Sequence, residues 1–181
     1  MGQYYKPCMI DDHKKVKSWI HPHEYDNGLK LMEHSYLGNN MMQAIMNLLK
    51  VGGLWYKQRI VWAGDYADPE FIGDKNQHAN LYDMCKDSKK IHPTDRLVNP
   101  MYLVNHTKNL YVDLTKLPKD PDNWCVHPLS LLTAEGNGRG GGDYRVENPY
   151  VGTWARHRLS AELEGFDVSK FKEIVPNFIM D

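Results

Sequence analysis

The sequence predicts an α+β protein with a mixed or mainly antiparallel sheet and few helices. Short runs of β-branched and aromatic residues recur along the chain, turn residues separate them, and only one segment has a strong helical pattern. Because 181 residues are enough for one ordinary hydrophobic core, we expect a single domain over residues 1–181, folded as one compact unit.

The N-terminal region has the pattern of a β-hairpin. Residues 3–10, QYYKPCMI, and 16–20, VKSWI, are rich in apolar and aromatic residues, and they flank the polar turn DDHKK. Proline cannot donate to a strand ladder, so Pro7 predicts that its strand lies at an edge of the sheet.

Residues 41–50 form the one strongly helical segment. Methionines, isoleucine and leucines recur there at helical spacing over a wide arc, which predicts a deeply buried helix. Asn39 or Asn40 is the expected N-cap, and Gly52-Gly53 the expected stop.

Three further segments complete the first half. Residues 58–64, QRIVWAG, predict a compact strand, and residues 77–85 a short helix. Residues 86–100 are polar and interrupted by two prolines, so we interpret them as the linker between two halves.

The second half also begins with a predicted hairpin, formed by residues 101–105 and 110–114 around the turn HTKN. Residues 124–134 and 155–163 are interpreted as strands, and residues 168–174 as a final short helix.

The order of motifs suggests an internal repeat of residues 4–68 and 101–167. Each half contains an aromatic hairpin, [IV]HP, a leucine pair, glycines and W-x-x-x-R-[IL]. The alternative is chance similarity between two α+β halves that use the same turn chemistry. Ile91-His92-Pro93 repeats the tripeptide outside the scheme and weakens it.

Composition and charge exclude several classes of protein. The net charge is −1 and evenly distributed, so no basic footprint for direct nucleic-acid binding is present. The three cysteines form no CxxC pair, which favours a reducing cytoplasm over a disulfide framework. No apolar run approaches membrane-spanning length, so we expect no membrane association and a cytoplasmic location.

The glycine-rich segment 136–144, GNGRGGGDY, is the candidate ligand site. Backbone N–H groups unshielded by side chains can bind an anion, and an arginine can clamp a phosphate or carboxylate. The candidate residues are Gly138, Arg139, Gly140, Gly141, Gly142 and Asp143. The same residues also fit a long turn between strands, or a loop that a partner's backbone approaches closely.

A metal site is a weaker alternative. His21, His23, Cys125 and His127 are zinc-capable, and the suggested repeat would place the two pairs at equivalent positions. Their spacings match no standard zinc module, so scattered structural histidines and cysteines are the favoured interpretation. We therefore predict no metal and no cofactor. No catalytic motif is recognisable, which favours a protein that is not an enzyme.

Several motifs together resemble a family of small hypothetical proteins of phages, prophages and gut bacteria: MGQYYKP, GLKLMEHS, RIVWAGDYAD, LLTAEGNGRGGGDY and VGTWARHRLS. The chain also resembles type II-A anti-CRISPR proteins, which are phage inhibitors of Cas9. That resemblance implies binding to Cas9 or to the Cas9–guide RNA complex in the bacterial host, with DNA binding or cleavage blocked.

The nearly neutral charge bears on how such an inhibitor would act. Mimicry of DNA needs a strongly acidic surface, so we expect occlusion through a shaped protein interface instead. The alternative function is a phosphate- or nucleotide-binding protein, or an enzyme, that uses the glycine-rich loop 136–144.

Overall fold

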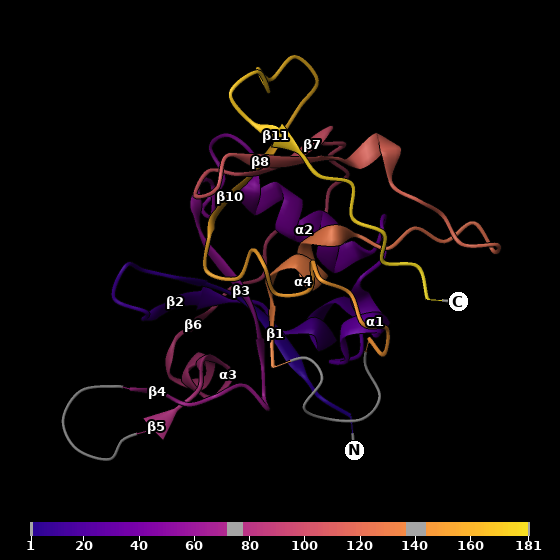
Figure 1. Ribbon diagram of the computed structural model, residues 1–181. Helices are drawn as coiled ribbons and strands as arrows, with labels where there is room; N and C mark the ends of the chain where they lie inside the picture. The colour runs from indigo at the N-terminus through magenta and orange to yellow at the C-terminus, as the bar shows by residue number, and fades with distance from the viewer. Residues whose placement is uncertain (1, 72–77, 137–143, 181) are drawn as a thin grey trace.

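The computed structural model describes residues 2–71, 78–136 and 144–180. In that part of the chain, a nine-stranded mixed sheet is surrounded by four short α-helices, so the predicted α+β class is confirmed (Figure 1). A separate two-stranded ribbon is formed by β4 (Glu70–Phe71) and β5 (His78–Ala79).

The strands of the main sheet are short. They are β1 (Tyr5–Ile10), β2 (Val16–Trp19), β3 (Gln58–Gly64), β6 (Lys89–Lys90), β7 (Tyr102–Asn105), β8 (Leu110–Asp113), β9 (Ala134–Glu135), β10 (Arg158–Glu162) and β11 (Lys172–Glu173). Their order is β11-β8-β7-β10-β3-β1-β2-β6, with β9 beside β3. The six central strands pair antiparallel, whereas β6, β9 and β11 pair parallel to their neighbours.

The helices are α1 (Leu31–His34), α2 (Asn40–Leu49), α3 (Leu81–Met84) and α4 (Pro128–Thr133), with three 3-10 turns, η1 (Pro22–Tyr25), η2 (Cys85–Asp87) and η3 (Leu114–Lys116). The predicted cap of α2 is confirmed, because the Asn39 side chain accepts from the N–H groups of Met41 and Met42 at 2.9 and 3.3 Å. The helix ends just before Lys50, close to the predicted stop.

Both predicted hairpins form, but the prediction that the strand containing Pro7 lies at an edge of the sheet is wrong. β1 lies between β2 and β3, with Pro7 opposite Trp62. The carbonyl of Pro7 still accepts from the N–H of Ile20 at 3.0 Å. A proline removes only its own donor, so the interior strand loses one possible ladder bond and keeps the rest.

Two of the predicted elements have the wrong type. Within residues 124–134, Pro128–Thr133 form helix α4 in place of a strand; the His127 ring caps it and Pro128 opens it. Within residues 168–174, the predicted helix is absent. After the Phe171 N–H bonds the carbonyl of Val168, the chain instead adds β11 to β8.

The main core lies between one face of the sheet and helices α2 and α4. On β3, Ile60 and Trp62 face this core, while Val61 and Ala63 face a smaller cluster that includes residues of α3 and η2. The large aromatic residues Trp55, Trp62, Trp154 and Tyr144 are all buried in this core. β3 is thus covered on both faces, which explains its almost continuous apolar sequence.

The smaller cluster brings together two cysteines that lie far apart in the sequence. Cys8 on β1 and Cys85 in η2 are both free and fully buried. The hydrogen bond with Cys85, together with burial, raises the pKa of the Cys8 thiol well above its usual value. Cys8 is therefore a neutral thiol, and both cysteines pack among apolar side chains.

The sheet has the same arrangement of strands on both sides of the central β3–β10 pair. The first strand of each hairpin lies next to this pair, with β1 beside β3 and β7 beside β10. Within the central pair, Arg59 lies opposite Arg158. The N–H of Lys57 bonds the carbonyl of Leu159 at 2.9 Å, and the N–H of Arg156 bonds that of Ile60 at 2.8 Å. This arrangement is a local two-fold relation; its origin in a sequence repeat stays a prediction, as does the single-domain assignment.

No helix in the described ranges has both the length and the apolar composition needed to cross a bilayer.

Candidate functional site

The candidate residues Gly138, Arg139, Gly140, Gly141, Gly142 and Asp143 lie outside the described residues, so their geometry stays a prediction. The described residue at the start of this segment is Gly136. Its φ is +94°, and an added Cβ would lie 2.5 Å from Nε2 of Gln3 and 2.9 Å from the backbone nitrogen of Ala67. Only glycine fits there without strain.

Gln3 occupies a buried position between two glycines. Its side chain is fully buried, and neither its amide oxygen nor its amide nitrogen has a hydrogen-bond partner among the described residues. A Cβ on Gly64 would lie 2.9 Å from the Gln3 amide nitrogen, nearly as close as one on Gly136. The two glycines therefore make the space that this amide fills.

An ion-pair cluster lies beside the start of the glycine-rich segment. Nε of Arg156 lies 2.5 Å from Oε1 of Glu135, and the same guanidinium contacts Oε2 of Glu135 at 2.9 Å and Glu70. The hydrogen bond that Arg156 donates to Glu135 is the main cause that raises the pKa of Arg156 above its usual value. Two carboxylates thus engage one guanidinium, a charge balance that does not favour a phosphate here.

The zinc-capable residues lie in two separate places. Nδ1 of His21 accepts from the backbone N–H of His23 at 3.2 Å, which caps η1. Nδ1 of His127 accepts from the N–H of Leu129 at 3.2 Å and caps α4, and Cys125 is buried nearby in the sequence. Over the described ranges, no group of three or more His, Cys, Asp or Glu side chains is arranged to hold a metal ion.

His34 is buried with both ring nitrogens paired. Nε2 accepts from the indole N–H of Trp62 at 2.9 Å, so Nδ1 carries the proton and donates to the carbonyl of Gly28 at 3.0 Å. Burial lowers the pKa of His34 to about 4 and that of His127 to about 3. Both rings are neutral structural groups at neutral pH.

A second polar network has the residue types of a catalytic triad, serine, histidine and glutamate, but its hydrogen bonds run in the opposite direction, because the serine donates to the carboxylate and not to the histidine. Oγ of Ser160 donates to Oε1 of Glu162 at 2.8 Å, so it accepts from Nε2 of His106 at 2.7 Å. Burial and the hydrogen bond with Glu162 raise the pKa of Tyr56 to about 12. Ser160 is fully buried and its proton is held by Glu162, so it is not poised as a nucleophile.

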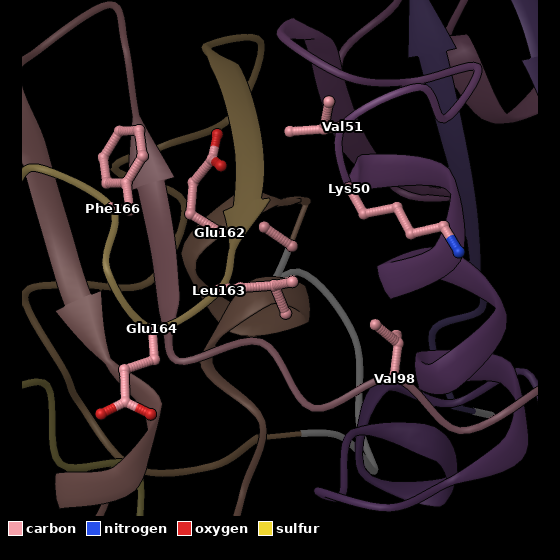
Figure 2. Close-up of a pocket in the computed structure, with 8 residues that line it drawn as sticks. Lys50, Val51, Val98, Glu162, Leu163, Glu164 and Phe166 are labelled. Atoms are coloured by element: carbon pink, nitrogen blue, oxygen red, sulfur yellow. The ribbon is translucent and has the colours of Figure 1, made fainter.

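An apolar hollow lies between the end of α2 and the end of β10. It encloses about 250 Å³, and its walls include Val51, Val98 and Leu163 (Figure 2). Figure 2 shows the Leu163 and Val98 side chains extending toward each other, with Val51 above them and the Lys50 side chain pointing away from Leu163. Val51 and Leu163 are 69% and 58% exposed, so the walls of the hollow present apolar surface to solvent.

This hollow is not evident in the sequence. Val51 and Leu163 each follow the end of a regular element, where an apolar residue has no face of its own element to pack against. In the sequence, an apolar residue just past the end of a helix or strand is the one sign that each side chain could be exposed. That sign does not show that Val51 and Leu163 line the same hollow, because they lie in different halves of the chain.

No protein-family model, curated protein or solved structure matches this chain, so the comparisons assign it to no family.

Proposed function

We propose that this protein acts by binding another protein, whose apolar side chain enters the hollow between Val51, Val98 and Leu163. The observation that carries the proposal is the exposure of Val51 and Leu163 around a formed cavity. Because Val51 and Leu163 are 69% and 58% exposed, burying the remaining surface of each on binding would contribute about 1–2 kcal/mol, before the costs of association.

The size of the hollow supports a partner side chain as the occupant. Small-molecule sites usually enclose about 300–1,000 Å³. The hollow here, at about 250 Å³, is smaller and suits one apolar side chain. Lys50 and Glu164 stand at its border, and the Lys50 ammonium is held by Oδ1 of Asn47 at 3.1 Å. An apolar centre with charged groups outside it is the usual arrangement of a protein interface.

The sequence resemblance supplies the candidate partner, Cas9 or the Cas9–guide RNA complex. We therefore propose a phage-encoded inhibitor that acts in the bacterial cytoplasm, covers a surface of Cas9 and so blocks DNA binding or cleavage. Its net charge of −1 supports occlusion by shape over mimicry of DNA. The alternative, a phosphate ligand held by residues 136–144, stays a prediction from the sequence.

The test is a Cas9 cleavage assay with excess protein, together with a pull-down of Cas9 with and without guide RNA. Inhibition is expected with the wild-type chain, and undiminished cutting rejects Cas9 as the partner. Leu163→Asp tests whether the hollow is the binding surface, and Val175→Asp is the matched control. Leu163 and Val175 are both 58% exposed, but only Leu163 lines the hollow. The variant at Leu163 should weaken binding at least tenfold, as for an interface anchor. Equal binding by the two variants would reject the hollow.

A further inference from the structure

A second pocket combines aromatic and acidic side chains. It encloses about 550 Å³, within the range of small-ligand sites, and is lined by Tyr36 and Trp124 together with Glu33 and Asp120. Glu33 belongs to α1 and Tyr36 to the connection between α1 and α2, whereas Asp120 and Trp124 belong to the chain between η3 and α4. Two segments far apart in the sequence therefore build one pocket.

The backbone holds the two segments together. Tyr36 forms an isolated antiparallel bridge with Val126, and the N–H of Leu37 bonds the carbonyl of Cys125 at 2.9 Å. This pairing fixes the chain immediately next to Trp124. Tyr36 and Trp124 consequently lie side by side, with ring centroids 5.3 Å apart and an angle of 67° between the planes.

A tight turn positions Trp124. The N–H of Asp120 bonds the carbonyl of Trp124 at 2.9 Å, and Oδ1 of Asp120 accepts from the N–H of Trp124 at 2.7 Å. Asn123 completes the turn with a left-handed φ of 67°. Although the backbone is fixed in this way, the Trp124 side chain stays 58% exposed, whereas the other four tryptophans are at most 7% exposed. A held but open indole is available to a ligand.

The two carboxylates use one oxygen each for local structure. Oε2 of Glu33 accepts from the backbone N–H of Lys30 at 2.9 Å, as Oδ1 of Asp120 does from Trp124. Over the described residues, neither carboxylate forms an ion pair. The pocket therefore has a net negative charge beside two aromatic rings.

We propose that this pocket binds an organic cation, with an alkylammonium or guanidinium group held between Tyr36, Trp124 and the two carboxylates. The face of an indole attracts a cation, and two rings at a steep angle offer two such walls. The carboxylates neutralise the charge of the ligand, which a purely aromatic pocket would not do. This site lies apart from the hollow of the proposed function and does not depend on it. The cation is supplied either by a free small molecule or by a basic side chain of a protein.

The experiment follows the indole N–H signals by two-dimensional NMR of the full chain, with the Trp124 signal assigned from Trp124→Phe. Tetramethylammonium, free arginine and arginine capped at both ends are the probes, and sodium acetate is the control for ionic strength. We expect the cations, but not acetate, to shift the Trp124 signal in a saturable way. Tighter binding of capped than of free arginine indicates a protein side chain as the source, and the reverse indicates a free small molecule.

Variants separate the two contributions. Trp124→Ala removes a wall of the pocket and should weaken cation binding about fivefold, the size expected for one cation–π contact. Glu33→Gln keeps an acceptor for the Lys30 N–H, and it should weaken binding about threefold by removing one charge. Asp122→Asn is the matched control, since it removes the same charge from the Asp120 turn outside the pocket lining.

Three results would overturn the proposal. They are an absence of cation-dependent shifts at the Trp124 indole, an equal response to acetate, or binding by Trp124→Ala as tight as that of the wild type. Because Trp124 is exposed, its replacement should leave the four buried indole signals in place, which shows in the same spectrum that the variant is folded.

Discussion

Acid should unfold this protein through His34 and His127, the two histidines that are buried among the described residues. Burial lowers the pKa of His34 to about 4 and of His127 to about 3, whereas an unfolded histidine titrates near 6.5. Between these folded-state values and about pH 6.5, the two histidines are therefore protonated in the unfolded state but not in the folded state. The stability from these groups is complete above about pH 6.5 and is lost as the pH falls toward the folded-state values.

The magnitude follows from the linkage relation. Between pH 7 and pH 5, each histidine removes about 2 kcal/mol from the free energy of unfolding, and the pair removes about 4 kcal/mol. His21, His106 and His157 also have lowered pKa values and add in the same direction. Exposed carboxylates such as those of Asp11 and Asp12 also have lowered pKa values, but they change the free energy of unfolding only at pH values below the range from 7 to 5.

The assay is urea unfolding at pH 7, 6 and 5, compared with the variant His127→Asn. Asparagine keeps an acceptor for the Leu129 N–H that His127 caps, and it does not titrate. The variant should therefore lose about 2 kcal/mol less than the wild type between pH 7 and pH 5. The comparison cancels the contributions of all other groups. An identical pH dependence in variant and wild type would refute the assignment of His127 as a buried neutral group.

Three further predictions concern stability and are checked by denaturant unfolding. Gly136→Ala and Gly38→Ala share the penalty of a left-handed φ, about 1 kcal/mol, but only the first also creates a close contact. Gly136→Ala should therefore cost more, and equal losses would contradict the close approach. Asn39→Ala should cost about 1 kcal/mol, while Asn39→Asp keeps the cap of α2; an unchanged midpoint for the alanine variant would count against the cap. Arg156→Lys should cost about 1 kcal/mol by losing the two-pronged contact with Glu135, and a neutral result would show that the two-pronged geometry adds nothing to the ion pair.

The elements read correctly from the sequence are those whose local pattern has one solution. Residues 58–64 form strand β3 with the predicted bounds, and the cap at Asn39 starts α2 as predicted. The six residues of α4 are too few for a helical period to be distinguished from a buried strand. The cap by His127 and the opening Pro128 were the signals that favoured the helix.

The candidate sites divide in the same way. The pairs His21 and His23, and Cys125 and His127, are evident in the sequence, but the structure uses the rings of His21 and His127 as helix caps. The residues of the apolar hollow and of the aromatic pocket gave no sequence signal as sets. Each set joins residues from segments that become neighbours only when the chain folds.

Local hydrogen-bonding and apolar periodicity are properties of neighbouring residues, so the sequence alone determined the α+β class, the two hairpins, β3 and α2. The position of the Pro7 strand in the sheet, and the joining of Val51 and Leu163 in one hollow, depend on contacts between distant residues. Only the tertiary structure decided these features, because the free energy of such contacts is gained when the sheet and the helices pack together.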